Sequence, residues 1–176
     1  MARISAERPR DWRVLVALPI ASFLVGVTSV WVPSVVGNGQ ASAQTQFDAT
    51  WATGMGLAFA LLVLLAKTAT TLLTIRAGGW GGVLTPAVAL GAGLGAVIGL
   101  PWATAWPGSE VAAFAFLGAA AFLGASMKAP FTGLILVIEF TGQGPTILVP
   151  AALAVGGATA AATWLSRRAS LGHQAR

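Results

Sequence analysis

Long stretches without a charged residue divide this chain into apolar segments. These charge-free stretches are residues 14–47, 49–66, 77–109, 111–127 and 140–166. A helix needs about 20 mostly apolar residues to cross the hydrocarbon core of a bilayer. In the first half of the chain, residues 14–32 and 50–73 reach that length, and the second of these segments contains Lys67. The pattern therefore predicts two membrane-spanning helices in this half.

Prolines divide the second half of the chain into shorter pieces. They are Pro86, Pro101, Pro107, Pro130, Pro145 and Pro150. The apolar pieces between them, residues 86–100, 114–127 and 130–140, are shorter than a spanning helix and are typical of re-entrant or half-spanning segments. Such backbone is tolerated at membrane depth only inside protein or along a polar cavity, so it indicates a permeation site. The predicted fold is an all-α membrane protein, a bundle of tilted spanning helices and broken or re-entrant helices.

The composition agrees with lipid as the solvent. Hydrophobic residues make up 56% of the chain and charged residues only 9%, whereas a soluble domain has about a quarter charged residues. The chain has no Cys and one His, His173. These counts exclude thiolate sites and histidine metal clusters, and carboxylates are too sparse for an acid–base pair. We therefore expect no catalytic residue, no metal and no cofactor.

The net charge of +5 comes mainly from the two ends of the chain. The terminal arginines are Arg3, Arg8, Arg10, Arg13, Arg167, Arg168 and Arg176. Basic ends that flank apolar spans suit lipid headgroups rather than nucleic acid. Because both ends are basic, the positive-inside rule does not fix the orientation.

We divide the chain into a basic leader (1–13), a membrane domain (14–166) and a basic tail (167–176). The apolar segment 14–32 is long for the core of a signal peptide and has no clean small-x-small cleavage site after it. We therefore expect a retained membrane helix, in a multi-pass integral protein of the cell membrane.

The stretch GGVLTP (81–86) predicts a helix start. Pro86 is favoured at the first helical position, and Thr85 before it is a plausible N-cap. The helix is then expected over residues 86–100. Gly81 and Gly82 allow a tight approach to this start, with positive φ if needed.

The N–H groups of Val83 and Leu84 would then point out of this helix end. They lie at the positive end of the helix dipole, and no carboxylate occurs between Asp48 and Glu110. Bare donors in a low-dielectric setting form an anion site from which the ion can still leave. The alternative is an ordinary capped helix whose donors are satisfied by the neighbouring loop.

A second helix start is expected at Pro130, which follows Lys128. Glu139 lies near the end of that helix, and Thr141 and Gly142 break it. An acid inside the membrane could relay protons. We favour the other interpretation, in which Glu139 is a structural hydrogen-bonding partner for a neighbouring loop.

Three glycines recur every four residues in the segment after Pro86. Gly91, Gly95 and Gly99 share one helix face, and Ala87 extends the row. Such a ridge lets a second helix backbone approach closely. We interpret it as a packing surface.

Four stretches together resemble the CLC family of chloride channels and proton/chloride antiporters. They are PSVVGNGQ (33–40), LLAKTATTLLTIRAGGWGG (64–82), GGVLTPAVALGAGLGAVIG (81–99) and GAAAFLGASMKAPFTGLILVIEFTG (118–142). The resemblance implies the second inverted repeat of a CLC subunit, which is half of that subunit. It also implies that the amides of Val83 and Leu84 help to hold chloride, the transported ligand.

The chain also departs from the family pattern. Leu84 replaces the usual Phe, and the serine-bearing and glutamate-bearing loops of the first repeat are absent. There is no Tyr, and Gly172 takes the place of the expected pore tyrosine. The implied function is chloride transport, as a channel or an antiporter, with this chain supplying half of the pore beside a first-repeat half or a second copy. The alternatives are a non-transporting packing subunit in the membrane and a truncated, inactive fragment.

Overall fold

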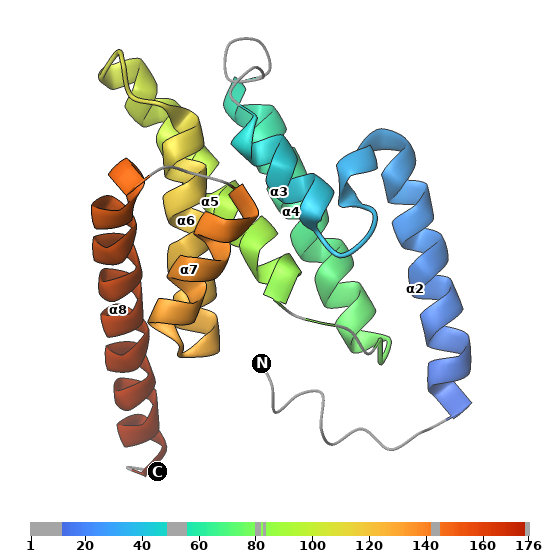
Figure 1. The fold of residues 1–176 in the computed structure, drawn as a ribbon. Coiled ribbons are helices and arrows are strands. Elements are labelled where there is room, and N and C mark those ends of the chain that lie inside the picture. Colours follow the sequence, from blue (N-terminus) through green and yellow to red (C-terminus); the bar gives the residue numbers. More distant parts are fainter. Residues whose placement is uncertain (1–11, 49–55, 80–81, 83, 142–144, 175–176) are drawn as a thin grey trace.

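The described residues of this protein lie almost entirely in helices (Figure 1). The computed structural model describes residues 12–48, 56–79, 82, 84–141 and 145–174, and it contains no strand within these ranges. The elements are α2 (Trp12–Trp31), η1 (Pro33–Val35), α3 (Gln40–Phe47), α4 (Gly56–Arg76), α5 (Leu84–Ala105), α6 (Val111–Met127), α7 (Pro130–Thr141), η3 (Pro145–Ile147) and α8 (Leu148–Gln174). The predicted all-α architecture is confirmed.

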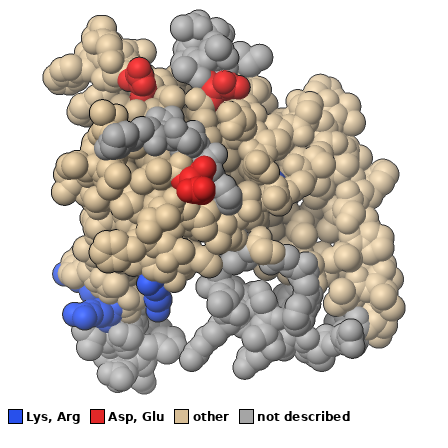
Figure 2. All heavy atoms as spheres, viewed as in Figure 1, with Lys and Arg blue, Asp and Glu red and all other residues tan. Residues whose placement is uncertain are grey.

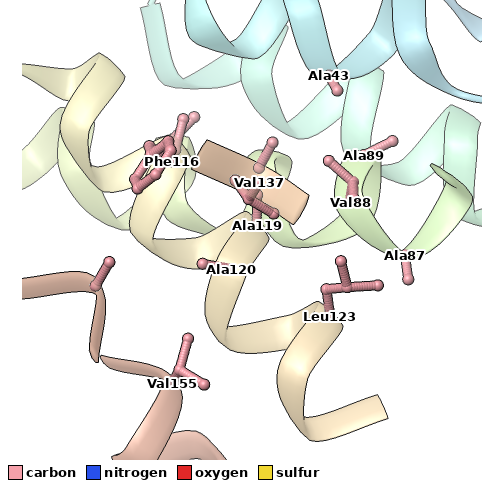
Figure 3. Packing of buried hydrophobic residues seen from close by; sticks show 14 of the residues in the cluster. Ala43, Ala87, Val88, Ala89, Phe116, Ala119, Ala120, Leu123, Val137 and Val155 are labelled. Carbon is pink, nitrogen blue, oxygen red and sulfur yellow. The ribbon is translucent and has the colours of Figure 1, made fainter. Parts of the chain in front are cut away.

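The core lies around α5 and α6 and consists largely of small residues. Side chains from α3, α5, α6, α7 and α8 meet there (Figure 3). Phe116 and Leu123 of α6 are its largest fully buried side chains, and they are surrounded mainly by alanine and valine. Small side chains let the helices approach one another closely, as is common in membrane proteins.

Four helices are long and apolar enough to cross a membrane. The spans are Val14–Trp31, Gly56–Arg76, Leu84–Ala105 and Leu148–Arg168. The first two agree with the predicted pair, although residues 49–55 lie outside the described part of the chain. The protein is a multi-pass integral membrane protein.

The structure corrects the predicted length of α5. This helix begins at Leu84 and continues through Pro101 to Ala105, so it has the length of a full span. A proline inside a helix removes only one backbone hydrogen bond, and membrane helices tolerate that loss. The short-segment prediction does agree with α7, which has 12 residues.

Tryptophans mark the two ends of the bundle. At the end of α5, the rings of Trp102 and Trp106 stack with their centroids 5.3 Å apart. Near the opposite end of the molecule, the Arg168 guanidinium lies 3.9 Å from the ring centroid of Trp164 on α8 (Figure 1). Tryptophan and arginine at helix ends are typical of the lipid headgroup region. The two aromatic sites therefore indicate two membrane interfaces.

Candidate functional site

The helix start predicted at Pro86 lies two residues earlier, at Leu84. Thr85 and Pro86 are therefore inside the first turn of α5, and Thr85 is not the N-cap. The first N–H groups of a helix have no partner within the helix, so a proline is tolerated in this turn. Gly81 and Val83 lie outside the described residues, which leaves Leu84 as the described member of the predicted N–H pair.

Gly82 precedes this turn with free space around it. Gly82 is exposed, and a Cβ added to it would meet no atom within 4 Å. Its φ is not in the left-handed region, so Gly82 does not use the positive φ that a glycine allows. Nothing in the described part of the chain requires a glycine here. Among the described residues, a larger side chain at position 82 would therefore meet no steric obstacle at its Cβ.

A loop from an earlier part of the chain packs against the first turns of α5. Gly39, between η1 and α3, has φ of 111°. A Cβ on Gly39 would lie 3.1 Å from the carbonyl oxygen of Thr85 and 3.2 Å from the Cβ of Ala89. Glycine suits the position because it has no steric penalty at positive φ and lets the two backbones approach. The sequence analysis did not predict α3, or that this loop reaches the start of α5.

Lys67 lies on the other side of this loop. Its side chain is 4% exposed, and Nζ donates to the carbonyl oxygens of Val35 (2.8 Å) and Gly37 (3.1 Å). Lys67 is the twelfth of the 21 residues of α4. At about 1.5 Å per residue, it sits near the middle of that span. The loop and the first turn of α5 therefore pack beside the middle of α4.

A small cavity opens beside this turn. Its volume is about 100 Å³. The lining residues are Asn38, Gln40, Ala43, Gln44, Phe47, Thr85 and Val88. The amide and hydroxyl groups of this set can donate hydrogen bonds and carry no charge. Ala43, Phe47 and Val88 are apolar, so Thr85 in the first turn of α5 borders a cavity of mixed polarity.

The glycine ridge of α5 faces α6. A Cβ on Gly91 would lie 2.5 Å from the carbonyl oxygen of Gly118, and one on Gly99 would lie 2.6 Å from the Cβ of Phe114. A Cβ on Gly95 would overlap the Phe114 carbonyl. The ridge is therefore covered within this chain.

Glu139 is exposed on α7, two residues before that helix ends at Thr141. As predicted, α7 begins at Pro130. Residues 142–144, which follow α7, lie outside the described residues, and the expected hydrogen bond from a neighbouring loop to Glu139 stays a prediction. Within the described ranges, no group of three His, Cys, Asp or Glu residues is placed to hold a metal.

Comparisons with known proteins agree with the chloride-channel resemblance. The family model described as "Voltage gated chloride channel" matches residues 1–163. The H(+)/Cl(-) exchange transporter ClcA of Yersinia pestis bv. Antiqua is 35% identical over 141 residues, which are 78% of this chain and 29% of that protein. The ClcA proteins of Cronobacter sakazakii and Klebsiella pneumoniae are each 33% identical, over 80% and 81% of this chain and 29% of each relative. The chain thus spans less than a third of the length of these curated relatives.

Proposed function

This chain belongs to the voltage gated chloride channel family, and from that premise we propose that it supplies half of a membrane pathway for chloride or a similar small anion. The relatives are named as proton/chloride exchangers, and this chain spans only 29% of their length. Transport is therefore proposed for the assembly in which this chain takes part.

The start of α5, which packs against the loop beside the middle of α4, carries this proposal. The N–H of Leu84 belongs to the group of helix donors without a partner inside the helix. Helix N-termini favour anions through these donors and through the helix dipole. The sequence has no carboxylate between Asp48 and Glu110, so no fixed negative charge of that segment competes with an anion. We propose that the amides of Val83 and Leu84 bind chloride there.

A complete pathway needs residues that this sequence does not contain. The serine-bearing and glutamate-bearing loops of the family, and its pore tyrosine, do not occur in it. No described atom lies within 4 Å of a Cβ built on Gly82, and the cavity beside Thr85 is lined partly by the core residues Ala43 and Val88. We propose that a first-repeat half, or a second copy of this chain, closes the pathway on the side of Gly82.

Packing within this chain weakens the alternative function, a non-transporting assembly subunit. That hypothesis uses the ridge of Gly91, Gly95 and Gly99 to bind a partner helix. In the structure, α6 already covers the ridge. A partner helix would have to displace α6 to reach it.

Chloride efflux from liposomes tests the proposal. The purified chain is reconstituted alone and with a candidate first-repeat half, and valinomycin-dependent chloride efflux is measured. Gly82→Leu fills the open space before α5, so we expect folding to be preserved and efflux to fall about tenfold or more, as when a site loses space for its ligand. The matched control is Gly157→Leu on α8, where a Cβ also meets no atom within 4 Å. It should leave efflux unchanged.

Two results would contradict the proposal. One is the absence of chloride efflux from every reconstituted combination, which would favour the assembly subunit or an inactive fragment. The other is efflux that Gly82→Leu and Gly157→Leu reduce equally, because the open space before α5 would then have no special role.

A further inference from the structure

We infer that Lys67 is a positioning residue, which fixes the first turn of α5 through the loop that joins η1 to α3. Its effect on anion binding rests on the proposed function. The mechanical link from α4 to α5 rests only on the contacts described below.

The first step of the link joins Lys67 to the loop. The 3-10 helix η1 ends at Val35, and the chain turns at Gly37, whose φ is 83°. Carbonyl groups at such a turn have no partner in a regular helix, and inside a membrane protein they need one. Lys67 Nζ supplies it to Val35 and to Gly37, at 2.8 and 3.1 Å. The loop can therefore pack beside the middle of α4 because a lysine of that helix binds its carbonyl groups.

The second step joins the loop to α5. Gly39 contacts three groups at once: the Thr85 carbonyl, the Ala89 side chain and the Cε of Lys67, all 3.1 to 3.3 Å from the position of its absent Cβ. The loop is therefore held between the lysine stem and the first two turns of α5. If the loop moves away from Lys67, the surface that supports the start of α5 moves with it.

Apolar contacts also hold the beginning of this loop. Val32 and Val35 are buried against Val63 of α4 in a small separate cluster. A methionine in place of Lys67 keeps the length of the stem and leaves this cluster intact. Lys67→Met should therefore fold with α2 and α4 still associated, while the two loop carbonyls lose their donor.

Single cysteine reporters can test this link, because the natural chain has no Cys. Thr85→Cys reports on the first turn of α5, and Thr104→Cys reports on the exposed far end of the same helix. The full chain in detergent micelles is treated with a charged methanethiosulfonate reagent, and the modification rates are compared. In the Lys67→Met background we expect the rate at position 85 to rise about tenfold, the change expected when buried acceptors lose their donor. The rate at position 104 should stay the same.

Lys128→Met is the matched control. Lys128 is exposed at the end of α6, so its loss removes the same charge without touching the loop, and neither rate should change. An unchanged rate at position 85 in Lys67→Met would overturn the inference. An equal rise at positions 85 and 104 would also overturn it, because it would show general loosening.

A second variant keeps the test decisive if Lys67→Met does not fold. Gly39→Ala places a methyl group against Thr85 and Ala89 at a positive φ, so it disturbs the same contact from the loop side. We expect it to raise the rate at position 85 and to leave position 104 unchanged. Equal rates at position 85 with and without this alanine would overturn the inference.

Chloride separates this inference from the proposed function. In a chloride buffer, compared with gluconate, modification at position 85 should be slower in the Lys67 background, and this protection should be lost in Lys67→Met. If chloride gives no protection in the Lys67 background, the anion site at the start of α5 is wrong. The rates measured in gluconate still decide whether Lys67 positions the turn.

Discussion

At the level of single residues, the packing of α5 on α6 depends on glycines, which have no side chain to separate the two helices. Gly95 and Gly118 leave the backbones of the two helices in contact, since a Cβ at either position would overlap the other helix. The four-residue spacing of the glycines was visible in the sequence. Which helix they would face was not, because any helix with small residues fits such a ridge.

We predict that Gly95→Ala lowers the free energy of unfolding by about 2 kcal/mol, because the added methyl must push α6 away. Denaturant unfolding in detergent, followed by circular dichroism, measures the change. Gly157→Ala is the control, since open space surrounds that glycine. It should be neutral or stabilise the helix by up to about 1 kcal/mol. Equal losses in the two variants would show that helix propensity, not packing, sets the effect.

The residues of the proposed anion site show which features can be predicted from neighbouring residue types alone. Glycines followed by Thr85 and Pro86 correctly placed a helix start in this region, although its first residue is Leu84. Gly82 does not use the positive φ that a glycine allows, and the residue types alone did not decide this. Binding of an anion by the amides stays a prediction.

At the level of whole elements, the length of α5 that was predicted from the prolines is wrong. The pattern ended this helix near residue 100, whereas Pro101 is inside it. A proline rule derived from helices in water overstates the cost in a membrane helix, where neighbouring groups satisfy the freed carbonyl. Only the helix as packed in the bundle shows that it continues.

We predict that Pro101→Ala raises the free energy of unfolding by about 1 kcal/mol, because residue 101 regains an N–H for the helix. Thermal unfolding in detergent measures the change. Pro130→Ala is the control: Pro130 is the first residue of α7, where an N–H has no partner inside the helix, so no stabilisation is expected. A lower melting temperature for Pro101→Ala would mean that α5 needs a bend at this point.

At the level of the whole molecule, the described charges other than Lys67 are distributed unevenly. In Figure 2, Lys and Arg gather at the lower left, and Asp and Glu lie in the upper half. The helix directions in Figure 1 agree, since α4, α6 and α8 all end at the lower side. These ends carry Arg76, Lys128, Arg167 and Arg168. The sequence did not fix the orientation of the protein in the membrane. The fold shows that one end of the helix bundle is more basic than the other.

We predict that this basic end faces the cytoplasm, following the positive-inside rule. Single cysteines at Ser109, next to Glu110, and at Ser166, next to Arg167, are labelled in cells with a maleimide that does not cross membranes. Position 109 should react in intact cells, and position 166 only after permeabilisation. The reverse pattern would contradict the prediction.

The sequence by itself determined that this protein lies in a membrane, where most of its helices occur and how the glycines of α5 are spaced. These features follow from the length of charge-free segments, from prolines and from small residues, each of which acts on the backbone next to it. Tertiary structure alone decided that Lys67, the loop at Gly39 and the first turn of α5 meet. The hydrogen bond from Lys67 to Val35 joins residues 32 positions apart. Contacts over such a separation depend on how whole helices pack, and no local pattern encodes them.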